Sequence, residues 1–413
     1  MFVQEERWRN AIAHGVDKDI RKDQLIDLTK PKTRADVYRW IRDGVYRISP
    51  PHTAQIPKDD GTFRTVYVNE PKDRVILNII NDLFFETMPE MIHPRCKSYQ
   101  KGIGCGQVVI EISERIEAAH GAVIGWKADL SKYFDRVPIR YIDEVFDKIE
   151  AKWGKSKVVD LVRDYYHSDI YLDGDNNVCM KYQSLKQGCA VAAFLADAVL
   201  YHVDDMLSKQ FGGNYTRYSD DMLFQEGDFM GAMRCLEDEL AKMEMELNPK
   251  KVDYLSSKEW FKFLGFSIKG RHRSLSPGRI KTFQKEIEAR TIKDRKASPK
   301  KALNAVLRYL YKGNGEFSWA TQILPVINVK SDLDKLNGFA MDCVRAVATN
   351  KRKLGGLGYV ASQKDGCIAR GTGRHVKANR AKMERIENFF SLGCMQNAMR
   401  MSRHLYKTLV GTL

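Results

Sequence analysis

The distribution of apolar and polar positions predicts a small sheet in the middle of the chain. Residues 122–126 form a continuous apolar run that is typical of a buried strand, and this strand would deliver Asp129 at its C-terminal end. Residues 214–217 and 222–224 are β-forming runs on either side of a tight-turn sequence, Tyr218-Ser219-Asp220-Asp221. The pattern therefore predicts a hairpin whose tip presents two adjacent carboxylates.

Two further hairpins and a series of helices account for most of the remaining pattern. One hairpin pairs residues 53–58 with 63–68 around a turn at 59–62, and a short one surrounds residues 173–177. The stretch 260–268 has the pattern of a strand with a glycine break. The 3.6-residue period predicts helices at 5–14, 33–42, 75–86, 107–119, 195–207, 229–245, 280–293, 300–311, 319–327, 333–348 and 380–413. This mixture of elements favours the α+β class.

Length and composition limit the kind of protein. The 413 residues are 43% hydrophobic, which is enough for two or three subdomains with buried cores. No run of 18 apolar residues occurs, and the charged N-terminus lacks the apolar segment of a signal peptide. The eight cysteines are scattered, without Cys-x-x-Cys or Cys/His zinc spacing. We therefore expect a cytoplasmic protein with reduced thiols and no membrane partner.

The formal net charge of +15 is concentrated at the C-terminal end. Residues 271–413 contain 29 Lys and Arg against 10 Asp and Glu, a net of +19. Residues 1–270 contain 39 against 43, a net of −4. Folding needs no such asymmetry, which indicates a polyanionic partner held mainly through its phosphates. A merely soluble basic surface is the alternative.

Three carboxylates at a strand end and a hairpin tip suggest a two-metal phosphoryl-transfer site. Asp129, Asp220 and Asp221 would supply the hard oxygen ligands that Mg²⁺ prefers. Two Mg²⁺ ions about 3.5–4 Å apart can activate a primer 3′-hydroxyl and stabilise leaving pyrophosphate, and Mn²⁺ is an alternative ion. An Asp-Asp pair alone is weak evidence, because most such pairs are solvated. We interpret Asp204-Asp205, in the 195–207 helical pattern, as such a polar helix face.

Cationic and aromatic residues accompany these acids. Lys58 and Arg64, near the tip of the 53–68 hairpin, would clamp the phosphates of a nucleotide, or are ordinary surface charges. Lys251, in the turn after the 229–245 helix, would lie near the nucleotide and protonate the leaving pyrophosphate. Of the adjacent aromatics, we interpret Tyr133 as a core residue. Phe134 would either pack under the sugar, where it would exclude a 2′-hydroxyl, or belong to the core.

Glycine-containing loops are candidates for contact with nucleic acid. Gly188 would let the backbone lie flat beneath a base pair, with Gln187 reaching the nucleotide or template. The basic loop 94–104 can approach a sugar–phosphate backbone closely, and a similar loop lies at 370–377. The candidate nucleic-acid-binding residues are Arg74, Ser98, Tyr99, Lys101, Arg370, Arg374 and Lys377.

In their order along the chain, these elements resemble the bacterial reverse transcriptases of the group II intron lineage. The resemblance covers about residues 50–270. Each element is weak alone, but the shared order argues against coincidence. The elements are Lys58, Arg64, Asp73-Arg74, Ser98-Tyr99, Asp129, Phe134, Gln187-Gly188, Tyr218-Ser219-Asp220-Asp221, Lys251 and Phe263-Leu264-Gly265-Phe266.

The resemblance implies a right-hand polymerase that copies RNA into DNA from deoxynucleoside triphosphates (dNTPs). It implies a helical extension at 1–50, fingers and palm at 51–270, and a basic helical thumb that binds RNA at 271–413. The three aspartates match the family's metal ligands. Matches to the nucleotide contacts are Lys58 and Arg64 for the triphosphate, Phe134 for the sugar gate, and Gln187 and Gly188 for the template and nucleotide platform.

Two departures from the family pattern bear on the subtype. Ser219 stands where Ala, Val or Met is usual, and Ala192-Ala193-Phe194 stands where Ser-Pro or Ser-Gln is usual. Together with the lack of a recognisable His-rich endonuclease or zinc module, they argue against an intron maturase or a diversity-generating enzyme. The remaining branch resembles the antiphage, type-2-like defence enzymes, which use a structured non-coding RNA as template and scaffold and release complementary DNA (cDNA).

Three other functions stay open on the sequence. A maturase-type or diversity-generating reverse transcriptase would share the same site. A non-catalytic RNA-binding scaffold has no use for three clustered like charges, which are costly. An RNA-synthesising polymerase is disfavoured by Phe134. Priming by a protein hydroxyl and by an RNA 2′-hydroxyl are both compatible with the sequence, as are several oligomeric states.

Overall fold

The computed structural model describes residues 1–15, 23–58, 62–120, 123–181, 183–294, 298–312 and 318–349, two short pieces at 361–362 and 366–367, and the single residues 392, 396, 399, 400 and 407. Its contacts divide the chain into two compact units. Unit 1 contains residues 1–102 and 124–255, and unit 2 contains residues 103–123 and 256–413. Each unit therefore combines segments that are far apart in the sequence.

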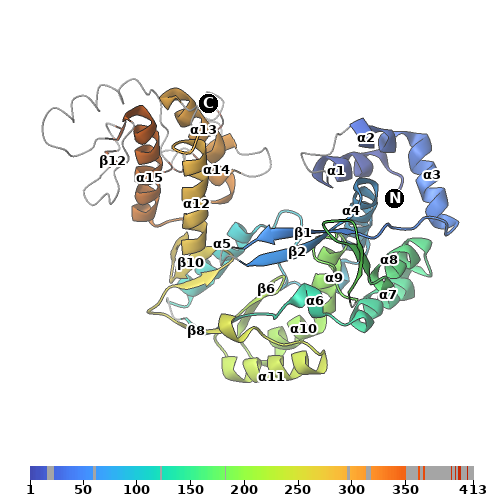
Figure 1. Ribbon diagram of the computed structural model, residues 1–413. Helices are drawn as coiled ribbons and strands as arrows, with labels where there is room; N and C mark the ends of the chain where they lie inside the picture. The colour runs from blue at the N-terminus through green and yellow to red at the C-terminus, as the bar shows by residue number, and fades with distance from the viewer. Residues whose placement is uncertain are drawn as a thin grey trace, which may run out of the picture. The chain divides into compact units, whose positions relative to one another are not determined.

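A four-stranded sheet, here called the central sheet, forms the middle of unit 1 (Figure 1). Its strand order is β6-β7-β3-β8, with β6 at Asn214–Tyr218, β7 at Asp221–Gln225, β3 at Ile124–Asp129 and β8 at Asp253–Ser256. The β3–β7 and β6–β7 pairs are antiparallel. Trp126 stacks on Phe224 across the sheet, with ring centroids 5.6 Å apart. The buried strand and the acid-tipped hairpin predicted from the sequence are both confirmed.

A second sheet of unit 1 has the order β2-β1-β4-β5. It combines the first predicted hairpin with the short one, which are paired through a parallel contact between His52 and Leu172. Both hairpins are confirmed, and the turn residues 59–61 lie outside the described residues. The strands are β1 at His52–Pro57, β2 at Phe63–Val68, β4 at Ile170–Leu172 and β5 at Val178–Met180.

Helices enclose the core of unit 1. Helix α4 (Pro71–Thr87) buries an apolar face that includes Ile76 and Ile80, and α1 (Glu5–Gly15) packs against it, with an ion pair between Arg7 and Glu86. Helix α10 (Tyr201–Gln210) contacts β6, and α11 (Phe229–Lys242) contacts β3. The other helices of unit 1 are α2 (Asp23–Ile26), α3 (Pro31–Arg42), α6 (Tyr133–Arg136), α7 (Ile139–Trp153), α8 (Lys157–His167) and α9 (Ala192–Val199), with 3₁₀ turns at Asp27–Thr29, Pro89–Met91 and Pro249–Lys251.

Unit 2 joins helix α5 (Cys105–Ala118) to a small antiparallel sheet and a set of helices. The sheet has the order β11-β10-β9, with β9 at Phe261–Phe263, β10 at Phe266–Lys269 and β11 at His272–Leu275. The helices are α12 (Pro277–Arg290), α13 (Pro299–Leu307), α14 (Trp319–Gln322) and α15 (Lys330–Thr349); a π-helical turn spans Arg308–Lys312, and β12 (Ala361–Ser362) pairs with β13 (Gly366–Cys367).

One strand prediction in unit 2 is wrong. The stretch 260–268 is a hairpin of β9 and β10, in which Phe263 pairs with Phe266. Leu264 and Gly265 both have positive φ, at 49° and 79°. Two consecutive left-handed residues reverse the chain at this point, so the glycine marks a turn between two strands.

The α+β fold class with antiparallel sheets and helices is confirmed. The boundaries of fingers, palm and thumb at residues 51, 270 and 271 stay a prediction, as does the 1–50 extension. The predicted helix at 380–413 falls almost wholly outside the described residues. None of the described helices is long and apolar enough to cross a membrane.

Candidate active site

Three carboxylates come together at one end of the central sheet. Asp129 ends β3 and Asp221 begins β7, and the two residues are direct partners in the antiparallel pair. Asp220 precedes Asp221 in the two-residue connection between β6 and β7. Directly paired residues of antiparallel strands have Cβ atoms about 4.5–5.5 Å apart. The register therefore makes the predicted acids neighbours although about 90 residues separate them.

The electrostatics of this cluster favour a bound cation. Burial, followed by the charge of Asp129, raises the pKa of Asp220, against the lowering effect of Lys251 and Arg64. Burial, followed by the charges of Asp220 and Asp129, raises the pKa of Asp221 to about 7. Clustered like charges disfavour ionisation unless a counter-charge is present.

Lys251 supplies part of that counter-charge. Its Nζ donates a hydrogen bond of 2.8 Å to Asp129 Oδ2 from the 3₁₀ turn Pro249–Lys251. Burial lowers the pKa of Lys251, but the hydrogen bond that it donates to Asp129 and the charges of all three aspartates raise it overall. Lys251 thus lies beside Asp129, and its ammonium is held in its charged form; its predicted place near the nucleotide stays a prediction.

The side chains present fit a divalent metal in chemistry. All three candidate ligands are carboxylates, the donors that Mg²⁺ prefers, and their mutual repulsion is what a cation would relieve. Across the described residues, no three or more His, Cys, Asp or Glu side chains have donor atoms already placed to hold a metal ion. Asp129 Oδ2 here accepts a hydrogen bond from Lys251 Nζ, and Asp129, Asp220 and Asp221 would be the residues to hold the ion.

The two predicted phosphate-binding cations lie on the β1–β2 hairpin. Arg64 in β2 is paired with Ile56 in β1, and the Lys58 backbone N–H donates to Thr62 O at 2.8 Å. Both cations are exposed. The positive charge of Arg64 acts on Asp220, as described above. Arg64 therefore lies within electrostatic range of Asp220.

The two aromatics that follow Asp129 have different environments. Tyr133 is 2% exposed and donates its hydroxyl to Ala196 O at 2.7 Å, which confirms it as a core residue. Phe134 is half-buried, and its carbonyl accepts a hydrogen bond from Ser184 Oγ. The Phe134 side chain lines a small cavity together with Tyr67 and Lys181. Its partial exposure is compatible with the predicted sugar gate.

Gln187 and Gly188 lie against strand β2. The Tyr67 backbone N–H donates to Gln187 O at 2.7 Å. Gly188 has φ of +104°, and a Cβ there would approach Tyr67 O to 2.9 Å. The glycine is therefore required by the close approach of two backbones within the protein, in addition to any role beneath a base pair.

The predicted nucleic-acid contacts divide into accessible and buried residues. Lys101 is exposed and lies 3.5 Å from Glu86, Tyr99 is 45% exposed, and Arg74 is half-buried in the first turn of α4. Ser98 is fully buried, so a direct contact of its side chain with nucleic acid is wrong for this structure. Arg370, Arg374 and Lys377 lie outside the described residues.

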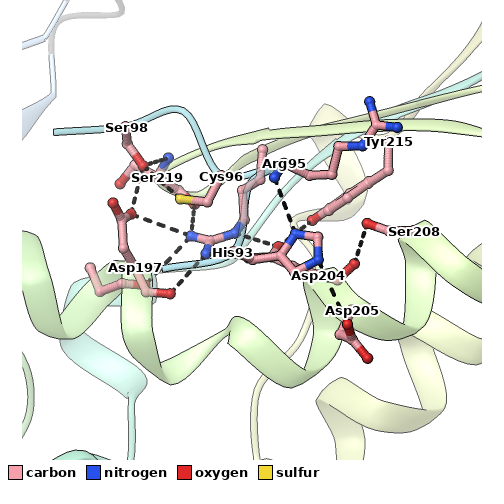
Figure 2. Close-up of polar contacts among 12 residues, drawn as sticks. His93, Arg95, Cys96, Ser98, Asp197, Asp204, Asp205, Ser208, Tyr215 and Ser219 are labelled. Carbon is pink, nitrogen blue, oxygen red and sulfur yellow. Dashed lines mark hydrogen bonds and ion pairs between the residues drawn. The ribbon is translucent and has the colours of Figure 1, made fainter. Parts of the chain in front are cut away.

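The interpretation of Asp204 as a solvated helix face is also wrong. Asp204 is fully buried and accepts two hydrogen bonds from Arg217, from Nε at 2.7 Å and from Nη2 at 2.6 Å (Figure 2). Its neighbour Asp205 is partly exposed and pairs with Lys209. A sequence signal for the buried pair existed: Asp197 and Asp204 lie seven residues apart in an apolar helical region, and Arg217 lies in a buried strand.

Comparison with known proteins identifies the family of the chain. The family model "Reverse transcriptase (RNA-dependent DNA polymerase)" matches residues 56–268, more than half of the chain. The chain belongs to the reverse transcriptase family. The enzyme class predicted from the sequence, an RNA-directed DNA polymerase, is thereby confirmed at the level of the family.

Individual relatives are distant. The chain is 24% identical over 208 residues to the Retron Ec48 reverse transcriptase of Escherichia coli, covering 48% of this chain and 47% of that protein. It is 23% identical over 181 residues to the putative COX1/OXI3 intron 2 protein of Saccharomyces cerevisiae, covering 42% and 20%. The matches thus span less than half of either relative. Apo telomerase from Candida tropicalis is similar in structure, with a TM-score of 0.45 and 12% identity over 73% of this chain and 59% of that one.

Proposed function

We propose that this protein is an RNA-directed DNA polymerase that extends a primer 3′-hydroxyl with dNTPs. The observation that carries the proposal is the pairing of Asp129 with Asp221 across β3 and β7, with Asp220 beside them. Family membership supports the reaction class. When bound, Mg²⁺ would supply Lewis-acid stabilisation of the charge that develops on the reacting oxygens.

The chain's own residues would contribute positioning and charge. Asp129, Asp220 and Asp221 would hold the metal ions. Lys58 and Arg64 would neutralise the triphosphate from the exposed hairpin. Gln187 and Gly188 would form part of the surface under the nucleotide, and Phe134 would exclude a 2′-hydroxyl. Lys251, beside Asp129, would act as a proton donor to leaving pyrophosphate.

Primer extension on an RNA template tests this function. The double variant Asp220→Ala/Asp221→Ala should lower the rate of dNTP incorporation by at least about 1,000-fold, because electrostatic stabilisation supplies much of the rate in such sites. The matched control is Asp238→Asn, an exposed carboxylate on α11, which should extend primers at the wild-type rate. Wild-type DNA synthesis by the double variant would contradict the proposal.

We further propose that the template is a structured non-coding RNA and that the enzyme acts in antiphage defence. The similarity to the Retron Ec48 reverse transcriptase and the +19 charge of residues 271–413 support a tightly held RNA. Sequencing of co-purified nucleic acid tests it. One defined RNA in both wild type and double variant, with cDNA in wild type alone, is the expected result.

The other outcomes of that sequencing have different meanings. An intron RNA in place of a short non-coding RNA would favour a maturase-type enzyme, to which the intron-encoded relatives point. If RNA co-purifies but no DNA is lost when Asp220 and Asp221 are replaced, the result would favour an RNA-binding scaffold. The defence role needs a separate plaque assay, in which the double variant should lose protection of the host.

A further inference from the structure

A buried polar cluster contacts Ser219, the residue that precedes Asp220 and Asp221 in the turn; Figure 2 shows Ser219 with Ser98, Asp197 and Asp204. We call it the turn clamp. All of its side chains are fully buried. They come from the 95–99 loop, helices α9 and α10, and strand β6. The members of the turn clamp are Ser98, Asp197, Asp204 and Arg217.

Arg217 uses every donor of its guanidinium within this cluster. Two hydrogen bonds go to the Asp204 carboxylate, as described above. The other three go to backbone carbonyls: to Asp197 O at 2.9 Å, to Ala196 O at 3.5 Å and to Ser219 O at 3.1 Å. Since an Arg side chain has five N–H donors, its position is fully determined by these acceptors.

Ser98 binds the same turn residue from the other side. The Ser219 backbone N–H donates to Ser98 Oγ at 2.9 Å, and Ser98 donates its own hydrogen to Asp197 Oδ1 at 2.6 Å. Both backbone polar groups of Ser219 are therefore bound by the turn clamp. The Ser219 side chain also contacts Tyr99, with 3.2 Å between the two hydroxyl oxygens.

Ser219 needs such support because its backbone is strained. Its φ is +57°, a positive value that costs a non-glycine residue about 1–3 kcal/mol. Asp220 is not among the described residues with positive φ, so only Ser219 of the two turn residues has a positive φ. In two-residue hairpins this distinguishes the II′ turn from the I′ turn, which needs positive φ at both residues. The two turns differ in the direction of the peptide between Ser219 and Asp220, and Arg217 binds the oxygen of that peptide.

A contribution to folding stability alone does not account for this cluster. Asp197 is fully buried, its Oδ2 is among the buried side-chain atoms without a hydrogen-bond partner, and burial raises its pKa to about 6. Buried ion pairs are often no better for stability than apolar residues of similar size. The cluster does, however, determine the direction of one specific peptide group, the one that leads into Asp220.

We propose that the turn clamp positions the carboxylates of Asp220 and Asp221 through the backbone of Ser219. Its members act as positioning residues and do not touch the substrate. The expected effect on kcat rests on the proposed function. The expected effect on metal affinity does not depend on polymerisation.

The decisive variant is Ser98→Ala in the full chain. It removes the acceptor for the Ser219 N–H and should lower kcat for dNTP incorporation about 10-fold, with KM for dNTP within about twofold of wild type. The dissociation constant for Mn²⁺ alone, measured by electron paramagnetic resonance without nucleic acid, should rise by a similar factor. The matched control is Ser113→Ala, another fully buried serine, which accepts from Arg273 at 3.1 Å and should change neither quantity.

A pair of substitutions at Asp197 separates positioning from general loss of stability. Asp197→Asn keeps an oxygen that can accept from Ser98 and should retain kcat and Mn²⁺ affinity near wild type. Asp197→Ala removes that acceptor and should reproduce the effect of Ser98→Ala. If Ser98→Ala does not fold, this pair decides the question by the same two measurements.

The outcomes distinguish this inference from the proposed function. Wild-type kcat and Mn²⁺ affinity in Ser98→Ala overturn the inference, as do losses that Ser113→Ala matches. Weaker Mn²⁺ binding in Ser98→Ala, in a protein whose wild type makes no DNA, would support the positioning role and contradict the polymerase function.

Discussion

At the scale of single residues, the half-buried ring of Phe134 yields a prediction about sugar selection. Its ring centroid lies 5.6 Å from that of Tyr133 in an edge-on contact, which restricts its orientation. Phe134→Ala should reduce the preference for dNTPs over ribonucleotides by roughly 10- to 100-fold, because the ring would no longer exclude the 2′-hydroxyl. Single-nucleotide incorporation, compared as kcat/KM for the two sugars, measures the effect.

The control for this prediction is the neighbouring tyrosine. Tyr133→Phe removes a buried hydrogen bond to Ala196 O and should cost about 1 kcal/mol of stability while leaving sugar preference unchanged. Unchanged selectivity in Phe134→Ala would show that the gate lies elsewhere.

Lys186 yields a prediction about pH. It is buried beside Tyr165, whose ring centroid lies 4.5 Å from its Nζ, and burial lowers the pKa of Lys186 from 10.5 to about 8. The folded protein therefore releases this proton at lower pH than the unfolded chain does. Between pH 8 and pH 10.5 the unfolded state binds more protons, so the contribution of Lys186 to stability rises with pH by about 3 kcal/mol.

Comparison with Lys186→Met isolates this contribution. The unfolding free energy of wild type minus that of the variant, from urea titrations between pH 7.5 and 10.5, should increase with pH. Lys155→Met, at an exposed position, should give a difference that is flat over the same interval. Parallel stability curves for wild type and Lys186→Met would contradict the buried, destabilised ammonium.

The residues that could be predicted from the sequence differ in a physical way from those that could not. Asp220 and Asp221 could be predicted because they sit at a turn between β-forming runs, which is a local pattern in the sequence. The partners of Asp204 and Ser98 could not be predicted, because a local pattern shows which face a residue occupies but does not identify its partner. The partner that buries Asp204 is Arg217, on a different element of unit 1.

At the scale of elements, Gly188 connects the 184–189 segment to strand β2. A Cβ at this position would meet Tyr67 O at 2.9 Å and Tyr67 N at 3.2 Å, and φ is +104°. Gly188→Ala should therefore push β2 away at a cost of about 1–3 kcal/mol. Because Arg64 is on β2, KM for dNTP should rise several-fold in the same variant.

Thermal unfolding and steady-state kinetics test this coupling of stability to nucleotide binding. The control is Gly174→Ala, in the turn between β4 and β5, where an added Cβ would meet nothing within 4 Å. It should leave both the melting temperature and KM unchanged. A wild-type KM in Gly188→Ala would show that the position of β2 does not affect triphosphate binding.

Elements with strong periodicity were predicted well, and turns between short strands were not. The helices α4 and α15 and the hairpin of β6 and β7 were predicted within a few residues of their observed limits. The β9–β10 hairpin was mistaken for one strand because its connection, Leu264-Gly265, contains an apolar residue. An apolar residue with positive φ at a turn is uncommon, so the local pattern contains little that would divide the strand.

At the scale of the whole molecule, the compact units combine segments that a linear pattern cannot assign to each other. Helix α5 is encoded before the central sheet, yet it contacts β10 and β11, which follow about 150 residues later. The β3–β7 pairing is similarly distant in sequence. Long-range pairings of this kind follow from packing, whereas hydrophobic periodicity reports only local structure.

The charge distribution yields the last prediction, the salt dependence of RNA binding. A polyanion held by the +19 region should bind with an affinity that falls linearly with salt on logarithmic axes, with a slope of about −0.7 per phosphate contact for single strands. Replacing the basic cluster Lys351, Arg352 and Lys353 by Gln should reduce that slope by about 2, if all three residues contact phosphate. Fluorescence anisotropy with a labelled RNA between 50 and 300 mM KCl measures it.

The matched control neutralises three exposed lysines of unit 1, Lys148, Lys155 and Lys209. It removes the same charge from the region whose net charge is −4, so a slope that depends on local contacts should stay at the wild-type value. Equal loss of slope in both triple variants would mean that net charge alone attracts RNA. In that case the C-terminal basic region would not be the RNA-binding surface, and the tightly held template would need another explanation.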